Sequence, residues 1–527
     1  MIWRVKEQKS TDLVEQLLIN RGLTKQSDIE AFFTPKLEIF QRQTELSGID
    51  KAWKRIEKAI DEGELIIVYG DYDVDGVCAS AVMYKALTSL GAKILPYIPH
   101  REKEGYGLSK TGLEFCRDSG AALVITVDNG IVAVEQAEFA KEIGLELIIT
   151  DHHLPADTLP PAHCIVHSTA MCGTAVAWCL VRGRISETLA KELLELVAIA
   201  TIADLMPLLE INRSFVYEGL KVLNKTKNLG LQELLRQAGL ELGKIGSYEI
   251  GHVIAPRINA IGRLEHAIDA LRLVCTKDPI KARRLAKLLC DKNVERQQLT
   301  SQSVDEARLM IKKDSQVHVM WSESWNPGII GLIAGRITEE LYAPSMAIAV
   351  ANGKGKGSAR SIDGINIVEV LRQTKDLLLE VGGHSGAAGF ALEEKNLPLF
   401  KKRIESLIAD VEVTGEKVLD IEAEIDPETL SKSLVKKLEQ FAPFGYKNPA
   451  IVLASRGMQI SDVRTLSEGK HLKFKANGID AIAFGMGEMV KKLLEVDSVD
   501  IAYNLEINEF RGSQNLQLKV KDIQLAL

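Results

Sequence analysis

The sequence has 527 residues, which is too long for one hydrophobic core and predicts three or four domains. Apolar residues make up 46% and charged residues 26%, the proportions of an ordinary globular protein, so long disordered segments are not expected. The formal net charge is −7, and nucleic acid would therefore have to be bound by local basic patches rather than by an overall positive field.

The first two regions differ in their hydrophobic pattern. Residues 1–45 place apolar side chains at helical spacing, which predicts a small helical N-terminal extension. Residues 46–215 alternate short apolar runs with amphipathic helices, the pattern of a parallel sheet with crossover helices. We expect strands that are buried on both faces at 65–69, 94–98, 123–127 and 147–150. Helices are expected between them, for example at 77–90 and 133–143.

The second half of the chain begins with a mostly helical region at 216–313. Its last part, 281–313, carries nine Lys or Arg against four Asp or Glu. A local charge of +5 on a long helix could follow a phosphate backbone, and a solvated face of a connecting helix explains it equally well. Residues 314–408 again mix strands with helices, whereas 409–527 are largely β and predict a small C-terminal barrel.

Three aspartates, Asp71, Asp73 and Asp75, alternate directly after the first expected strand of the sheet. In an open parallel sheet, a ligand binds just beyond the carboxyl ends of the strands. Carboxylates so close together repel one another unless a cation neutralises them, and Mg²⁺ or Mn²⁺ favours such oxygen ligands. Taken alone, the run fits an Asp-rich surface turn as well as it fits a metal site.

The ends of two further expected strands carry polar residues to the same edge. Asp128 follows the strand at 123–127, and Asp151, His152 and His153 follow the strand at 147–150. Imidazole mixed with carboxylate suits Mn²⁺ or a similar ion better than Ca²⁺.

A further carboxylate, Asp204, lies in a strongly apolar stretch. Its charge needs a partner there, which a metal, a helix cap or a salt bridge would provide. Two ions bridged by a shared carboxylate supply an activated water and a clamp for a phosphoryl oxygen. The set of acidic residues therefore indicates phosphoester hydrolysis.

The acidic runs resemble the four motifs of the DHH phosphoesterase superfamily, and their spacing is most similar to its single-strand-specific 5′→3′ exonucleases. The four runs are Asp71-Tyr-Asp-Val-Asp-Gly76, Val127-Asp-Asn-Gly130, Asp151-His-His153 and Thr201-Ile-Ala-Asp-Leu-Met-Pro207. Further similar stretches follow in the right order at 100–108, 255–263, 325–331, 357–361, 382–389 and 443–449. The resemblance covers essentially the whole chain.

This resemblance implies an α/β fold with several domains. A parallel-sheet DHH domain at 46–215 would be joined by a long helix within 216–313 to a smaller α/β DHH-associated domain at 314–408. A C-terminal β-barrel of the OB-fold type would occupy 409–527.

The resemblance also implies a role for each residue of the site. Two ions, Mn²⁺ or Mg²⁺, would be held by Asp73, Asp75, Asp128, His152 and Asp204. Asp128 would bridge the two ions, with Asp73 binding one of them and the remaining ligands the other. The catalytic residues would be Asp75, Asp128 and His153, of which His153 contacts the scissile phosphate. Asp71 would support the cluster from nearby.

Two glycine-rich runs are candidates for substrate binding. The run at 353–361 could form a phosphate cradle of backbone N–H groups and cationic side chains, or a flexible hairpin turn. It lacks the Walker pattern, so ATP binding is not indicated. By resemblance, the DNA backbone or its 5′-phosphate would be bound by Arg101, Arg257, Ser358 and Arg360. His384, in the second run, would contact the substrate across an interdomain cleft.

The seven cysteines are odd in number and scattered, without a C-x-x-C pair, so they indicate neither a disulfide framework nor a zinc site. The N-terminus lacks the apolar core of a signal peptide, and no apolar run approaches the ~20 residues of a membrane-spanning helix. We therefore expect a cytoplasmic protein without membrane contact.

Three functions remain to be distinguished. The favoured one is a metal-dependent exonuclease that degrades single-stranded DNA 5′→3′ to mononucleotides in repair and recombination. The alternative is a phosphodiesterase of short oligonucleotides or cyclic dinucleotides, against which the long helix and the barrel argue. A replication scaffold without activity is disfavoured, because all four acidic motifs are intact. Single-stranded DNA is the expected partner, with a single-strand-binding protein and a helicase as candidates, and the protein is expected to be a monomer.

Overall fold

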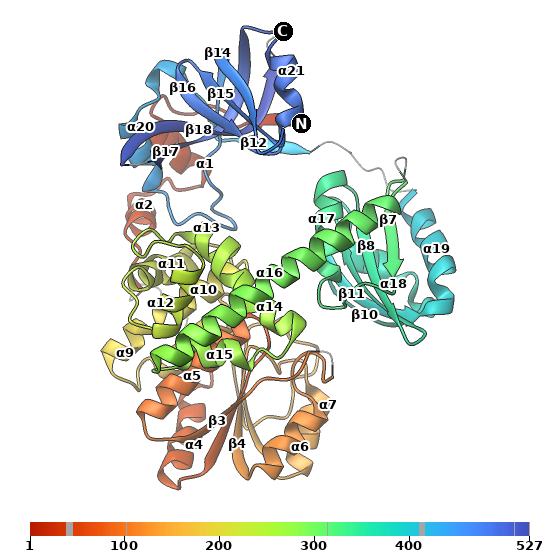
Figure 1. Cartoon of the computed structure of the whole chain (residues 1–527). Coiled ribbons are helices and arrows are strands. Elements are labelled where there is room, and N and C mark those ends of the chain that lie inside the picture. Colours follow the sequence, from red (N-terminus) through yellow and green to blue (C-terminus); the bar gives the residue numbers. More distant parts are fainter. Residues whose placement is uncertain (38–45, 102, 313–314, 410–416, 511, 526–527) are drawn as a thin grey trace. The chain divides into compact units, whose positions relative to one another are not determined.

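The computed structural model describes residues 1–37, 46–101, 103–312, 315–409, 417–510 and 512–525 (Figure 1). The chain forms two compact units. The sheet unit consists of Ser47–Ala190 and Asn224–Lys417, and the barrel unit of Met1–Leu46, Lys191–Leu223 and Val418–Leu527. Among the described residues, no helix has both the length and the apolar character needed to cross a membrane.

The sheet unit begins with a five-stranded parallel sheet in the order β3-β2-β4-β5-β6. The strands are β2 (Leu65–Tyr69), β3 (Lys93–Tyr97), β4 (Ala121–Val127), β5 (Glu146–Asp151) and β6 (Cys164–His167). The accompanying helices are α4 (Ile49–Asp61), α5 (Val74–Ser89), α6 (Lys110–Asp118), α7 (Val134–Glu142) and α8 (Gly173–Val181). The prediction of a parallel sheet with crossover helices is confirmed.

Two details of this sheet differ from the prediction. The strand β3 is not buried on both faces, because it lies at the edge of the sheet and alternates exposed with half-buried residues. The strand β6 was not predicted, since four residues are too few for a clear periodicity. The helix α5 begins at Val74, three residues earlier than expected, because Asp73 caps it by accepting a hydrogen bond from Gly76 N.

The next part of the sheet unit is helical. Its helices are α12 (Leu229–Gln237), α13 (Ser247–Glu249), α14 (Ala255–Leu264), α15 (Ile268–Cys275) and the long α16 (Pro279–Leu309). The helix α16 begins at a proline, and Asp278 accepts hydrogen bonds from the N–H groups of Ile280 and Lys281. Its first half packs on α12, α14 and α15, and it also contacts α17 (Ile330–Leu341) of the following domain. The predicted long connecting helix is therefore present (Figure 1).

A second sheet follows in the order β10-β11-β9-β8-β7, in which β7 and β8 are parallel and the other pairings are antiparallel. Its strands are β7 (His318–Ser322), β8 (Ser345–Ala351), β9 (Lys354–Arg360), β10 (Leu378–His384) and β11 (Ala387–Glu393). The helices of this domain are α17, α18 (Ile367–Arg372) and α19 (Leu397–Ala409).

The glycine-rich run at 353–361 is neither a phosphate cradle nor a flexible turn, so this prediction is wrong. Most of it is the strand β9, whose backbone is paired on both sides with β8 and β11. Its buried glycines make room for apolar neighbours, and a Cβ on Gly357 would overlap the ring of Phe390. The backbone of β9 is therefore engaged in the sheet, and a ligand could be bound only by its side chains, among them Ser358, Arg360 and the exposed Lys354 and Lys356.

The barrel unit confirms the predicted C-terminal barrel. Its strands are β14 (Leu453–Leu466), β15 (His471–Ala476), β16 (Ile479–Ala483), β17 (Ser498–Phe510) and β18 (Ser513–Leu525). They pair in this order around the barrel except that β18 precedes β17, and the pairing of β14 with β17 closes it. The short strands β12 (Val418–Ile421) and β13 (Ala423–Glu424) precede it. The helices of the unit include α1 (Leu13–Asn20), α2 (Gln26–Phe33), α10 (Leu194–Ala203), α11 (Glu210–Leu223) and α20 (Lys432–Glu439).

The sequence predicted a helical N-terminal extension. In the structure, only part of this segment is helical. It begins with the strand β1 (Ile2–Val5), which pairs in parallel with β12. The guanidinium of Arg4 forms a two-bond ion pair with Asp420 of that strand. A partner more than 400 residues away in sequence thus decides the conformation of this segment.

Arg213 of α11 joins three segments of the barrel unit. Its side chain is buried, and its guanidinium lies 3.7 Å from the ring centroid of Phe32. Its nitrogens donate to the carbonyl oxygens of Phe32 (2.8 Å), Ala442 (2.8 Å) and Pro443 (3.3 Å). Burial and the nearby Arg21 lower the pKa of this guanidinium to about 10, so it remains charged at neutral pH.

Replacing Arg213 by methionine should destabilise the barrel unit. The aliphatic packing is kept, but three buried carbonyl groups lose their donor, which costs about 3 kcal/mol of unfolding free energy. We expect a lower urea midpoint for peptides of β14 and β17, measured by hydrogen exchange, and no change for peptides of β2 and β4. The control Arg4→Met removes an exposed ion pair of the same unit and should cost no more than about 1 kcal/mol. Equal midpoints for the two variants would contradict the anchoring role of Arg213.

Candidate metal centre

The carboxyl ends of β2, β4 and β5 carry the polar residues that the sequence singled out. These strands are neighbours in the sheet, so their ends meet at one edge. Two groups of side chains there have ligand atoms within 4.8 Å of one another: Asp71, Asp73 and Asp128, and Asp128, His152 and His153. The structure thus brings together the residues of the first three acidic motifs.

Asp75 is held by the amino ends of two helices. It lies in the first turn of α5, and its oxygens accept hydrogen bonds from Gly173 N (2.6 Å) and Thr174 N (2.7 Å) at the start of α8. Free N–H groups at helix amino ends stabilise negative charge. The carboxylate therefore keeps a defined position although it is buried.

Asp128 follows β4 in the left-handed backbone conformation, with φ at 64°. This conformation is costly for a residue with a side chain and is typical of functional sites. A Cβ on Gly173 would lie 2.6 Å from Asp128 Oδ1, so only glycine allows α8 to approach this carboxylate. The start of α8 thereby contacts both Asp75 and Asp128.

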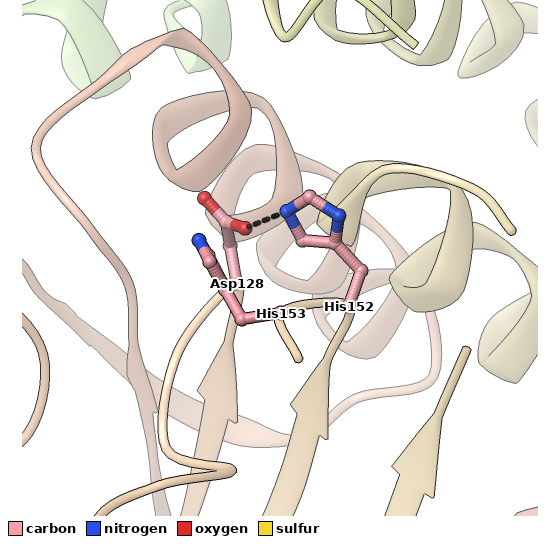
Figure 2. A group of neighbouring side chains, drawn as sticks. All are labelled: Asp128, His152 and His153. Atoms are coloured by element: carbon pink, nitrogen blue, oxygen red, sulfur yellow. Dashed lines mark ion pairs between the residues drawn. The ribbon is translucent and has the colours of Figure 1, made fainter. Parts of the chain in front are cut away.

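His152 lies between these two carboxylates. Its Nε2 is 3.1 Å from Asp128 Oδ1 and 3.6 Å from Asp75 Oδ2. Figure 2 marks the contact of His152 with Asp128 by a dashed line. Burial lowers the pKa of this imidazole, which favours the neutral form that binds metals.

The aspartates themselves are poorly stabilised as anions by the protein alone. Burial raises the pKa of Asp71, Asp73 and Asp128, and the neighbouring carboxylates raise it further. One buried oxygen of Asp71 has no hydrogen-bond partner among the described residues. Carboxylate oxygens with one neutral imidazole are the donor set of a divalent ion such as Mn²⁺ or Mg²⁺. The residues present therefore fit such an ion.

Asp151 acts on His153 rather than facing the cluster. One of its oxygens lies 2.8 Å from His153 Nδ1 and accepts from the N–H groups of His152 and His153, while the other accepts from Ile131 N. Burial acts to raise the pKa of Asp151, but the hydrogen bonds from His153 and the backbone outweigh it, so the net pKa is lowered. Asp151 thus stays ionised and fixes the ring of His153.

Tyr106 is a site residue that the sequence did not reveal. Its hydroxyl donates to Asp128 O (3.2 Å) and lies 3.0 Å from His153 Nε2. Burial and the nearby carboxylates raise its pKa, so the hydroxyl stays protonated. The sequence contains only a weak signal for Tyr106, namely its two flanking glycines. In the structure, Gly105 and Gly107 both adopt positive φ.

The predicted substrate-binding residues lie at several places in the sheet unit. The guanidinium of Arg101 is 4.8 Å from the ring centroid of Tyr72, and Arg257 of α14 donates to Val253 O. Arg360 donates to Ser358 Oγ (2.9 Å), and both face Gly331 at the start of α17. His384 ends β10 and is exposed.

Arg263 at the end of α14 was not predicted. It donates to Gly328 O of the second domain (3.0 Å), and its pKa is lowered to about 10 by burial and by Arg101, Arg296 and Arg360, while Asp73 acts in the opposite direction. Several arginines thus lie near the acidic residues. Asp204, in contrast, follows α10 in the barrel unit, and its role as a ligand stays a prediction.

Three family models match the chain. The DHH family N-terminal domain matches residues 65–201, the DHHA1 domain 314–410 and the RecJ OB domain 421–522. These matches agree with the two sheets and the barrel described above.

Full-length relatives extend the match. The single-stranded-DNA-specific exonuclease RecJ of Bacillus subtilis is 36% identical, with 97% of this chain and 68% of the relative covered. The protein of the same name from Escherichia coli is 31% identical, with 97% and 95% covered. The crystal structure of RecJ from Thermus thermophilus in complex with Mn²⁺ has a TM-score of 0.86 and 30% identity, and the match covers 100% of this chain and 80% of that one. The chain therefore belongs to the RecJ family.

Proposed function

We propose that this protein is a divalent-metal-dependent exonuclease that hydrolyses single-stranded DNA 5′→3′ to mononucleotides. The observation that carries the proposal is the buried group of aspartates and His152 at one edge of the parallel sheet. Curated relatives at 31–36% identity over nearly the whole chain are named single-stranded-DNA-specific exonucleases. Structures of such a relative were determined with Mn²⁺ and with Mg²⁺.

We assign two ions, Mn²⁺ or Mg²⁺, to the ligands Asp73, Asp75, Asp128, His152 and Asp204. Asp128 would be the ligand shared by both ions, an assignment supported by its nearness to both Asp73 and His152. Bound ions would lower the pKa of a water and neutralise the charge that develops on the phosphoryl oxygens. Asp71, which is buried beside them, would help to hold Asp73 and Asp128 in place.

The protein's own groups hold and orient the phosphate. His153, fixed by Asp151 on one nitrogen, directs its Nε2 at the scissile phosphate, and Tyr106 restricts the rotation of the ring. The α8 amides that hold Asp75 keep the acidic residues preorganised, so little rearrangement is needed in the transition state.

The strand is bound by Arg101, Arg257, Ser358, Arg360 and His384. The pair of Ser358 and Arg360 beside the start of α17 suits a terminal 5′-phosphate, since a guanidinium and free helix N–H groups both favour anions. Binding of that phosphate next to the catalytic group would account for 5′→3′ polarity. We also propose a monomeric cytoplasmic protein acting in repair and recombination, with a single-strand-binding protein and a helicase as partners.

The second candidate is a phosphodiesterase of short oligonucleotides or cyclic dinucleotides. It would use the same acidic residues. The long α16 and the C-terminal barrel favour longer strands, because both add surface that a dinucleotide does not reach.

Metal binding can be tested without any substrate. We expect 1 mM Mn²⁺ to raise the melting temperature of the protein by several degrees, because an ion that binds only the folded state stabilises it. Asp128→Asn keeps the shape but removes a charge shared by both ions, and should abolish most of this shift. The exposed control Asp118→Asn should shift like the unchanged protein. An undiminished shift in Asp128→Asn would contradict the bridging role.

The activity and its polarity can be tested with a 5′-phosphorylated 20-nucleotide strand in Mn²⁺. A label on the 3′ end should give a ladder of shortening fragments, whereas a label on the 5′-phosphate should appear at once in mononucleotide. Duplex DNA should stay intact, and Asp128→Asn should lower the rate by at least about a thousandfold, since it disrupts both ions. Cleavage of dinucleotides alone would favour the second candidate function.

A further inference from the structure

A cavity of about 490 Å³ lies between the helices α16 and α17 of the sheet unit. Among its lining side chains are Arg296, Gln297, Gln298, Thr300 and Ser301 of α16, and Arg336 of α17. None of the described residues that line the cavity is acidic. Its walls therefore offer two positive charges and several neutral hydrogen-bonding groups.

The two guanidiniums of the cavity are suited to bind an anion. Arg296 is half-buried, and its Nε is buried without a hydrogen-bond partner among the described residues. Within the part of the chain that the structure describes, its Nη2 donates to a neutral partner, Asn293 Oδ1, at 3.1 Å. Burial lowers the pKa of Arg296, and the positive charges of Arg336 and Arg257 lower it further. Because arginine stays protonated, this repulsion is relieved by an anion and not by loss of a proton.

The arginines of the cavity continue a series of positive charges that begins with Arg263, next to the acidic cluster. Arg263 interacts electrostatically with Asp73 of the acidic cluster and with Arg296. Arg296 in turn interacts with Arg336 on the far helix. A strand whose end is held at the acidic cluster would therefore meet the cavity with a phosphate further along its backbone.

We propose that this cavity binds an internal phosphodiester of the single-stranded substrate, beyond the nucleotide that is cleaved. The proposal rests on the proposed function and deepens it. Arg296 and Arg336 bind the phosphate oxygens, and the side chains of Gln297, Gln298 and Ser301 donate to the phosphate or sugar. Such contacts do not distinguish bases, as degradation of any sequence requires. Of the basic residues that give the stretch 281–313 its positive charge, Arg296 is the one that would contact the phosphate.

The test compares Arg296→Gln and Arg336→Gln with Arg284→Gln, a matched loss of charge at an exposed position of α16 outside the cavity. Binding of a fluorescent dT20 strand is measured by anisotropy at several salt concentrations in the inactive Asp128→Asn background. We expect each cavity variant to weaken binding about tenfold, as loss of a charge-assisted contact does. The slope of log K against log salt should become shallower by about 0.7 per lost contact.

In the active protein, the same variants should raise KM for dT20 about tenfold and change it less than about twofold for dT2, because the one phosphodiester of dT2 is the bond that is cleaved and none is left for the cavity. Circular-dichroism melting and the Mn²⁺ shift should match those of Arg284→Gln, which shows that the variants fold. An affinity for dT20 and a salt slope equal to those of Arg284→Gln would overturn the proposal.

A second outcome would overturn the proposal and show that the cavity binds a free nucleotide phosphate. If the variants abolish inhibition by dTMP but leave dT20 binding unchanged, the cavity holds a free mononucleotide and not the strand. Failure of the unchanged protein to degrade dT20 would contradict the proposed function itself. The anisotropy measurement still decides in that case whether the cavity binds a strand.

Discussion

Burial of several aspartates at one edge of a parallel sheet is the constraint that shapes the sheet unit. Asp71, Asp73 and Asp128 repel one another in a setting where burial already disfavours their charged forms. Their closeness is possible because the strands end side by side and because α8 directs its free N–H groups at Asp75. A protein that tolerates such an arrangement without a cation loses stability, so the cluster is best understood as a cation site.

The opposite charge is placed on other elements of the same unit. Arginines on α14, α16 and β9 lie near one another, and Arg336 of α17 lies near Arg296 of α16. Arg263 interacts electrostatically with both Asp73 and Arg360. The acidic residues are suited to cations, and under the proposed function the arginines would bind the anionic backbone of the strand. This separation explains how a chain with a net charge of −7 can be suited to nucleic acid.

Local patterns were sufficient for many elements but not for all. The strands β2, β4 and β5 were predictable because their buried apolar runs are continuous, and the ligands directly follow them in sequence. The strand β1 was missed because its conformation depends on pairing with β12. The glycine run at 353–361 was misinterpreted, because its backbone pairs with β8 and β11 and a Cβ on Gly357 would overlap the ring of Phe390.

By itself, the sequence determined the α/β class, the sheet edge that collects Asp73, Asp75, Asp128 and His152, and the resemblance that supplies a substrate. These features follow from residue order, because in a parallel sheet every strand delivers the residue after it to the same edge. Only the tertiary structure decided that Tyr106 contacts His153, that Gly173 lets α8 approach the carboxylates, and that Arg296 and Arg336 line one cavity. Such pairs come from segments that are distant in sequence or lie on different helices, so packing alone brings them together.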